Sequence, residues 1–173
     1  GLDIRLCDVE YRTANIDPEL IEYCINEKTK AIVSVDYAGY PCRIDRILEI
    51  ARKHALTVVH DAAQSCGSKY KGEYAGTQAK VSCFSFHATK NLSTGEGGCL
   101  VTNDDELAER AYVLRDKGTN KRSFIDQKDL GYYEYQMLGN SYVQSDILGA
   151  LALSQLKKLD WMNRRRAEHA TYL

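Results

Sequence analysis

The sequence predicts an α/β fold in three layers, with a mostly parallel sheet and helices on both of its faces. Short apolar runs alternate along the chain with segments in which apolar residues recur every three or four positions. This alternation is typical of βαβ units, whose parallel strands are joined by helices that pack on the sheet. Polar residues, Asp61 and Lys90, follow two of the apolar runs. Because open α/β sheets bind ligands at the carboxyl ends of their strands, both are candidate site residues.

The first part of the chain contains four predicted elements. Apolar and polar side chains alternate over residues 1–10, which predicts a short strand. Asp17 and Pro18 then start a helix of about two to three turns, since proline is tolerated at the first helical position. The nearly continuous apolar run Ala31–Val35 predicts a strand buried on both faces. The helical spacing of apolar residues over 44–54 predicts an amphipathic helix that packs on the sheet.

The middle of the chain continues the pattern with strands and one turn-rich segment. Thr57–His60 is the next predicted strand, and Asp61 ends it. Lys71–Gly76 contains two glycines and is a hairpin candidate. Val81–Phe86 and Cys99–Thr102 are predicted as two further strands, on either side of the glycine-rich loop that carries Lys90.

Two helices and a long loop are predicted after the last strand. Asn103 or Asp104 caps the first of these helices, whose first turn is acidic and which ends at a Lys-Gly pair. Residues 119–140 have no clear period, and a loop of this length is usually functional or disordered. Its aromatic run Tyr132–Tyr135 favours an ordered, binding role. A last helix capped at Ser145, or at the next residue, is predicted to continue toward the end of the chain.

Composition favours small-molecule chemistry. The 173 residues are 44% hydrophobic and 27% charged, and the net charge of −1 gives no reason to expect nucleic acid or an anionic membrane as a partner. Arg164–Arg166 is interpreted as the solvated face of the last helix. No apolar run approaches the ~20 residues of a membrane span, and no signal peptide is recognisable, so a cytoplasmic protein is expected. The chain starts without methionine, and we therefore expect residues 1–173 to be a fragment.

Metal and redox chemistry are not predicted. The six cysteines are widely spaced, without a Cys-x-x-Cys pair, and the four histidines show no metal-binding spacing. Cys83 and Cys99 fall in apolar runs, which predicts reduced, buried packing residues. Dinucleotide and P-loop fingerprints and the Gly-x-Ser-x-Gly elbow are also absent from the sequence. The segment Gly95–Gly98 leads into a strand, so its glycines are expected to let backbone pass closely.

Asp61 and Lys90 together suggest a cofactor. A carboxylate beside the nitrogen of an aromatic heterocycle keeps that ring protonated, because an opposite charge stabilises the cation. A lysine nearby can bond covalently to an aldehyde on the same ring. These are the two polar anchors of a pyridoxal 5'-phosphate (PLP) site. Taken alone, the residues also allow a solvated loop lysine, and a His60 that only fixes its neighbour Asp61.

The motifs around these two residues carry a family resemblance. Asp61–Gln64 and Ser85–Gly98 resemble the DegT/DnrJ/EryC1/StrS family of PLP-dependent sugar aminotransferases, which have the aspartate aminotransferase fold. The likeness extends to Val35–Gly39 and Arg115–Asn120, and so across nearly the whole chain. Within the family, these motifs look most like the branch that aminates a dTDP-4-keto-6-deoxyhexose to dTDP-4-amino-4,6-dideoxygalactose. The resemblance implies that residues 1–173 are part of the large PLP-binding domain, without its upstream segment and the C-terminal small domain.

The resemblance also implies roles for five residues. Lys90 bonds to the cofactor aldehyde and then moves protons, and Asp61 binds the pyridine nitrogen. Gln64 lies beside the ring hydroxyl, Ser85 contacts the cofactor phosphate, and Asn140 reaches the phosphate of the partner subunit's site. Each has a simpler alternative, since Ser85 could be an ordinary strand serine, Gln64 a loop hydrogen-bonder and Asn140 a turn residue. The presence of Lys90 argues against the related dehydratases, which have histidine at that position.

Other residues near these motifs have open roles. His87 is expected to pack or to support its neighbours, and Lys121 and Arg122 either meet a nucleotide diphosphate or face solvent. Tyr135 stands where this branch usually has tryptophan, a departure that bears on the substrate.

The implied reaction is transamination of a nucleotide-linked 4-keto-6-deoxyhexose with an amino acid donor, glutamate by resemblance, for a surface polysaccharide or antigen sugar. The implied enzyme is a homodimer, and the piece alone is expected to be inactive. Two alternatives remain at this point. One is a non-catalytic binding or assembly module of the same fold, and the other is a different PLP-dependent reaction on a nucleotide sugar.

Overall fold

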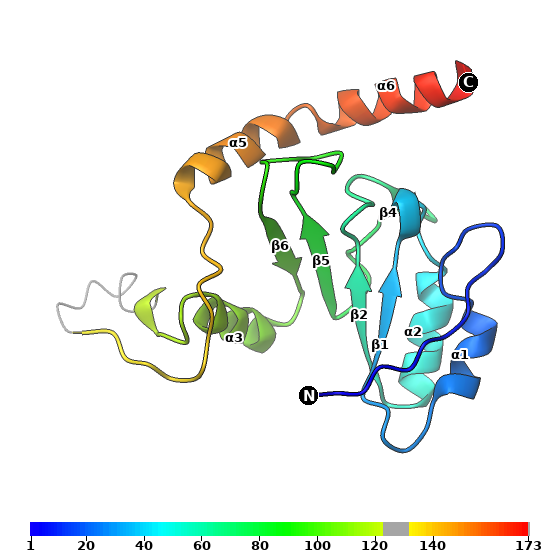
Figure 1. The fold of residues 1–173 in the computed structure, drawn as a ribbon, viewed down its shortest axis with the longest axis horizontal. Coiled ribbons are helices and arrows are strands. Elements are labelled where there is room, and N and C mark those ends of the chain that lie inside the picture. Colours follow the sequence, from blue (N-terminus) through cyan, green and yellow to red (C-terminus); the bar gives the residue numbers. More distant parts are fainter. Residues whose placement is uncertain (123–131, 173) are drawn as a thin grey trace.

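A four-stranded sheet forms the centre of the protein (Figure 1). The computed structural model describes residues 1–122 and 132–172. The strand order is β1-β2-β5-β6, and the strands are β1 (Ala31–Val35), β2 (Thr57–Asp61), β5 (Val81–Ser85) and β6 (Gly98–Val101). β1, β2 and β5 are parallel to one another, and β6 is antiparallel to β5. The predicted α/β class with a mostly parallel sheet is therefore confirmed.

Two helices, α1 (Pro18–Cys24) and α2 (Ile44–Lys53), lie together beside β1 and β2, and α2 contacts both strands. α1 begins at Pro18, as predicted, and the Asp17 side chain caps it by accepting a hydrogen bond from the Glu19 N–H. The apolar positions of α2 face the sheet, and Ile47 is completely buried there. Burying a side chain of this size contributes about 1.5–3 kcal/mol. The buried core comprises Ile21, Ile32, Cys42, Ile44, Ile47, Ile50, Ala51, Val58 and Ala79.

The prediction that Ala31–Val35 is buried on both faces is wrong for this chain. Burial alternates along β1, with Ile32 and Ser34 buried on the α2 side and Val33 60% exposed on the other. Cys99 on β6 is likewise exposed, and Cys83 is only half-buried, although both were predicted as buried packing residues. The physical reason in each case is that no described residue fully covers the side chain, which therefore stays accessible to solvent. All six cysteines are free thiols, as predicted.

The predicted strand over residues 1–10 does not form. Within this segment only Val9 makes a bridge, to Ile16, and the side chains of Leu2 and Ile4 are exposed. A strand needs a neighbour to accept and donate its backbone hydrogen bonds, and alternation of side chains does not supply one.

The predicted hairpin forms with slightly earlier bounds. β3 (Lys69–Tyr70) pairs antiparallel with β4 (Glu73–Tyr74). Lys71 and Gly72 join them, both with positive φ, as a type I′ hairpin turn requires.

The helix after β6 also follows its prediction. It is α3 (Asp105–Arg115), and its N-cap is Asp104, whose carboxylate accepts a hydrogen bond from the Leu107 N–H. The predicted loop at 119–140 includes residues 123–131, which lie outside the described residues.

The last predicted helix is two helices. α5 (Asp146–Leu156) begins at the predicted N-cap Ser145, and α6 (Leu159–Tyr172) follows after a turn at Lys157 and Lys158. Among the described residues, no helix is long and apolar enough to cross a membrane.

Candidate functional site

The carboxyl ends of β1, β2 and β5 meet at one edge of the sheet. In the parallel register Val35 pairs with Asp61, and Asp61 pairs with Cys83, two residues before Ser85. The Asp61 carboxylate accepts a hydrogen bond from the Ala63 N–H at 2.9 Å, which fixes its direction at the start of the following turn. Asp61 and Ser85, both predicted site residues, therefore end neighbouring strands.

Gln64 lies in the turn that follows β2. Its side-chain oxygen accepts a hydrogen bond from the Ala38 N–H at 3.2 Å, in the 3-10 turn after β1. The two segments approach so closely that a Cβ at Gly39 would lie 2.7 Å from the Gln64 carbonyl oxygen. Gly39 also has a φ of +80°, so glycine is required there on both counts.

Lys90 lies in the loop between β5 and β6, which is held by its own backbone. The Phe86 N–H donates to the Gly97 carbonyl at 2.8 Å, and the Thr94 N–H donates to the Phe86 carbonyl at 2.9 Å. At its end a Cβ on Gly98 would lie 2.6 Å from the Phe84 carbonyl oxygen. Close backbone passage at the glycine-rich segment is thus confirmed, and Lys90 is presented by an ordered loop.

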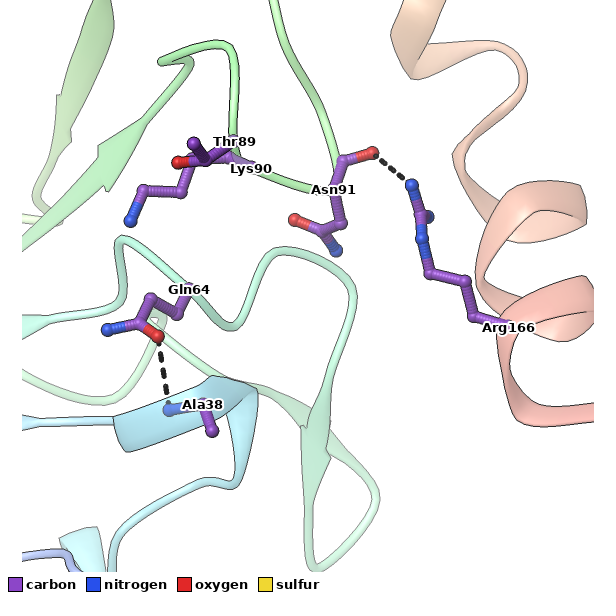
Figure 2. A pocket seen from close by; sticks show the side chains of 6 residues that line it. All are labelled: Ala38, Gln64, Thr89, Lys90, Asn91 and Arg166. Carbon is purple, nitrogen blue, oxygen red and sulfur yellow. Dashed lines mark hydrogen bonds between the residues drawn. The ribbon is translucent and has the colours of Figure 1, made fainter. Parts of the chain in front are cut away.

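Lys90 and Gln64 line the same pocket (Figure 2). The pocket has a volume of about 390 Å³, within the range of small-molecule sites. Its lining residues are Ala38, Gln64, Thr89, Lys90, Asn91 and Arg166. These six include two cationic side chains and no acidic one, so the pocket favours an anionic ligand.

Arg166 is a pocket residue that the sequence analysis missed. Arg166 is exposed, as expected for a solvated helix face, and α6 also places it against the Lys90 loop (Figure 2). Its guanidinium donates to the Asn163 side-chain oxygen at 3.3 Å and to the Asn91 carbonyl at 3.5 Å. No spacing in the sequence indicates this contact, because Asn91 and Arg166 are 75 positions apart.

The remaining predicted residues lie outside the pocket lining. Ser85 accepts a hydrogen bond from the His87 N–H at 3.2 Å, and Asp61 lies three residues before Gln64. Asn140 is exposed, and its backbone bonds to Leu114 and Lys117 at the end of α3. The structure thus brings Lys90 and Gln64 together, with Asp61 and Ser85 at the adjacent strand ends, and leaves Asn140 apart.

The residues with open roles lie at the surface. His87 is exposed, and its Nδ1 lies 3.0 Å from the Thr89 hydroxyl. The Arg122 guanidinium lies over the ring of Tyr112, 3.5 Å from its centroid.

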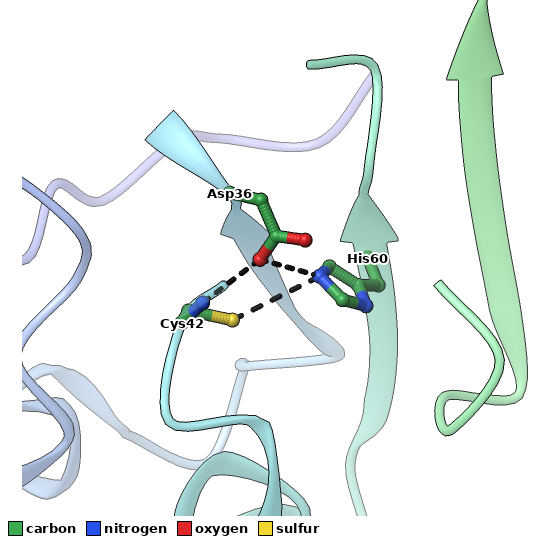
Figure 3. A group of neighbouring side chains, drawn as sticks. All are labelled: Asp36, Cys42 and His60. Atoms are coloured by element: carbon green, nitrogen blue, oxygen red, sulfur yellow. Dashed lines mark hydrogen bonds and ion pairs between the residues drawn. The ribbon is translucent and has the colours of Figure 1, made fainter. Parts of the chain in front are cut away.

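A buried polar cluster lies just behind the strand ends (Figure 3). Asp36 Oδ1 accepts hydrogen bonds from the Cys42 N–H and from His60 Nε2, each at 2.9 Å. The Cys42 sulfur lies 3.8 Å from the same His60 nitrogen. Burial alone would raise the pKa of Asp36, but the hydrogen bonds from His60, Ser65 and Cys42 outweigh it and lower that pKa.

The ligand-type atoms of Asp36, Cys42 and His60 lie within 4.8 Å of one another, which also suits a metal ion. Their present partners favour a hydrogen-bond network instead. Asp36 Oδ1 already accepts two hydrogen bonds. Burial raises the pKa of the Cys42 thiol to about 12, so the thiol is protonated at neutral pH within this network. We therefore interpret the cluster of Asp36, Cys42 and His60 as a structural hydrogen-bond network.

Comparison with known proteins decides the family. The model of the DegT/DnrJ/EryC1/StrS aminotransferase family matches residues 1–173. The chain belongs to this family. Its PLP-dependent members carry out the chemistry that Asp61 and Lys90 suggest, and the predicted family resemblance is confirmed.

Three proteins illustrate the similarity. The chain is 42% identical over 165 residues to the spore coat polysaccharide biosynthesis protein SpsC of Bacillus subtilis, covering 94% of this chain and 42% of that protein. It is 40% identical over 156 residues to the UDP-4-amino-4,6-dideoxy-N-acetyl-beta-L-altrosamine transaminase of Helicobacter pylori, covering 90% of this chain and 40% of that protein. The crystal structure of the sugar aminotransferase CalS13 from Micromonospora echinospora superposes on this chain with a TM-score of 0.89 at 35% identity. The match covers 99% of this chain and 47% of CalS13.

The chain spans less than half the length of each of these proteins. The family and the fold are thus established for residues 1–173.

Proposed function

We propose that the full-length protein containing this chain is a PLP-dependent aminotransferase that acts on a nucleotide-linked 4-keto-6-deoxyhexose. The observation that carries the proposal is the pocket shared by Lys90 and Gln64, with Asp61 at the adjacent strand end, in a member of a sugar aminotransferase family. The donor is L-glutamate, and the product serves a surface polysaccharide or antigen. The reaction takes place in the cytoplasm.

The residues present fit PLP. Asp61 would pair with the pyridine nitrogen, and Gln64 would lie beside the ring near its hydroxyl. Ser85 would contact the phosphate, and the cations Lys90 and Arg166 give the pocket the charge that a phosphorylated ligand needs. When bound, PLP supplies an electron sink for the carbon from which a proton is removed.

Lys90 is the proposed proton carrier. Its amine sits on the pocket wall opposite the segment of Gln64, held by a loop whose backbone hydrogen bonds restrict its movement. With PLP bound, the Lys90 amine would hold the cofactor through its aldehyde, and the free amine would move a proton at the reacting carbon.

The finer proposals concern the substrate and the assembly. The motif Arg115–Asn120 supports a dTDP-linked sugar and the 4-amino-4,6-dideoxygalactose product. Residues 1–173 form part of the large domain, and the enzyme is a homodimer in which Asn140 reaches the phosphate at the partner's site. The exposed position of Asn140, away from the pocket of its own chain, is compatible with such a role.

Borohydride reduction of the full-length protein after incubation with PLP tests the proposal. Peptide mass mapping should find a phosphopyridoxyl group on Lys90, and Lys90→Ala should abolish this modification. Lys80→Ala is the matched control, since Lys80 pairs with Asp104 outside the pocket. A folded protein that is saturated with PLP but unmodified at Lys90 would contradict catalysis and favour a binding module. Product analysis with dTDP- and UDP-linked keto-sugars and glutamate then identifies the substrate.

A further inference from the structure

Asp36 lies at the centre of the segments that carry the proposed cofactor residues. It follows β1 directly, it is completely buried, and its backbone N–H donates to the Asp61 carbonyl at 3.0 Å. The main chain of Asp36 therefore holds the last residue of β2 in place.

The Asp36 carboxylate makes contacts on both sides of the Asp61–Gln64 turn. Oδ1 accepts a hydrogen bond from His60, the residue before Asp61, at 2.9 Å (Figure 3). Oδ2 accepts one from the hydroxyl of Ser65, the residue after Gln64, at 2.6 Å. One buried carboxylate thus fixes both ends of the turn that presents the two cofactor residues.

The two ring nitrogens of His60 differ in their partners, and Nε2 is the one that contacts Asp36. Its Nδ1 is buried and has no hydrogen-bond partner among the described residues. A cationic histidine would leave an N–H donor unpaired at that position, which is costly. A single proton on Nε2 instead gives the hydrogen bond to Asp36, and the carboxylate remains an anion that accepts every hydrogen bond directed at it.

We propose that Asp36 is a positioning residue that sets the spacing and direction of Asp61 and Gln64 through His60 and Ser65. This inference rests on the proposed function, because it assumes that Asp61 and Gln64 hold PLP. Gln64 also accepts a hydrogen bond from the Ala38 N–H at 3.2 Å, but the hydrogen bonds inside the turn do not reach β1. The Ser65 N–H donates to the Ala62 carbonyl at 3.1 Å, and the Ala63 N–H to the Asp61 carboxylate at 2.9 Å. Neither contact anchors the turn to β1.

Ser65→Ala in the full-length protein tests the link most selectively. It removes one hydroxyl and leaves Asp36, His60 and Asp61 unchanged. We expect the PLP dissociation constant of the apoprotein to rise about 10- to 100-fold, the size seen for partners that orient metal ligands. Ser65→Thr keeps the hydroxyl and should restore binding to near the wild-type value.

Ser82→Ala is the matched control. Ser82 is also a completely buried serine, on β5, but its hydroxyl has no hydrogen-bond partner among the described residues. Ser82→Ala should therefore leave the PLP dissociation constant unchanged. Asp36→Asn retains the shape without the charge and should weaken PLP binding at least as much as Ser65→Ala, with a changed absorption maximum of the bound cofactor.

Each outcome separates the two proposals. Wild-type protein that binds PLP at Lys90, with Ser65→Ala and Asp36→Asn binding equally tightly, would overturn the positioning role alone. Wild-type protein that does not bind PLP would overturn the proposed function and the positioning role with it. If Asp36→Asn fails to fold, the comparison of Ser65→Ala, Ser65→Thr and Ser82→Ala decides. Stoichiometric zinc in the purified wild-type protein that is lost in Asp36→Asn would show that the cluster is a metal site. This result would also overturn the inference.

Discussion

The side-chain amide of Asn91 donates a hydrogen bond to the Cys66 carbonyl at 2.6 Å. Asn91 directly follows Lys90, and Cys66 lies two residues after Gln64. Asn163 on α6 donates to the same carbonyl at 3.2 Å. A single carbonyl group therefore joins the lysine loop, the Gln64 turn and α6, which are distant in the sequence.

Asn91→Ala should loosen this junction. We expect the free energy of unfolding of the full-length protein to fall by about 1 kcal/mol, the usual net value of one hydrogen bond. Urea titration measures the change, and hydrogen exchange should show faster exchange in the lysine loop. Asn103→Ala is the control, because Asn103 is exposed and its side chain has no hydrogen bond to any residue that the structure describes. Equal effects of the two substitutions would show that the Asn91–Cys66 contact does not contribute to the free energy of unfolding.

Gly67→Ala should disturb the same junction from the other side. A Cβ at Gly67 would lie 2.5 Å from the Asn163 side-chain nitrogen, so Asn163 must move away from Cys66. Gly72→Ala is a close control, since Gly72 has a similar φ (+91° against +85°) and nothing within 4 Å of its Cβ. Both variants carry backbone strain of about 1–2 kcal/mol.

Gly67→Ala should cost about 1 kcal/mol more than Gly72→Ala, the value of the hydrogen bond that Asn163 loses. Urea titration of both variants gives this difference directly. If the two variants are equally destabilised, Asn163 does not stabilise the turn.

Cys42 should be inert toward alkylating reagents in the folded protein. Its side chain is almost completely buried, and burial raises the pKa of the thiol to about 12. At pH 8 only about one such thiol in 10,000 is ionised, and the thiolate is the reactive form. Mass mapping after iodoacetamide treatment should find Cys42 unmodified in buffer and modified in concentrated urea. Rapid alkylation of Cys42 in the folded protein would show that the cluster with Asp36 and His60 opens readily.

The order of elements was predictable because it depends on local patterns. Apolar periodicity located β1, β2 and α2, and the N-caps Asp17, Asp104 and Ser145 were recognisable because a short polar side chain precedes each helix. The strand predicted over residues 1–10 does not form, because alternating apolar and polar side chains do not reveal whether a neighbouring strand exists.

The site was predictable only in part. Lys90, Asp61 and Gln64 lie in motifs that carry the family resemblance. The structure places Asp61 at the end of β2, and Lys90 and Gln64 in the pocket at the same edge of the sheet. Arg166 and the cluster of Asp36 with His60 were not predictable, because tertiary packing brings together residues that no sequence spacing connects.

Asp36 should make the stability of the protein depend on pH in the acid range. Its folded-state pKa is lowered, whereas in the unfolded chain an aspartate titrates near its ordinary value of about 3.9. The stabilisation is therefore fully present above the unfolded pKa and is lost as the pH falls through the folded pKa. At pH 7, Asp36→Asn should lower the free energy of unfolding by about 1.5–3 kcal/mol, the value of hydrogen bonds to a charged group. Urea titrations at several pH values between 7 and 3 should show the difference between wild type and variant shrinking below about pH 4. A difference that stays constant over this range would mean that the buried carboxyl group is not ionised at neutral pH, and that the hydrogen bonds from His60 and Ser65 do not stabilise an anion.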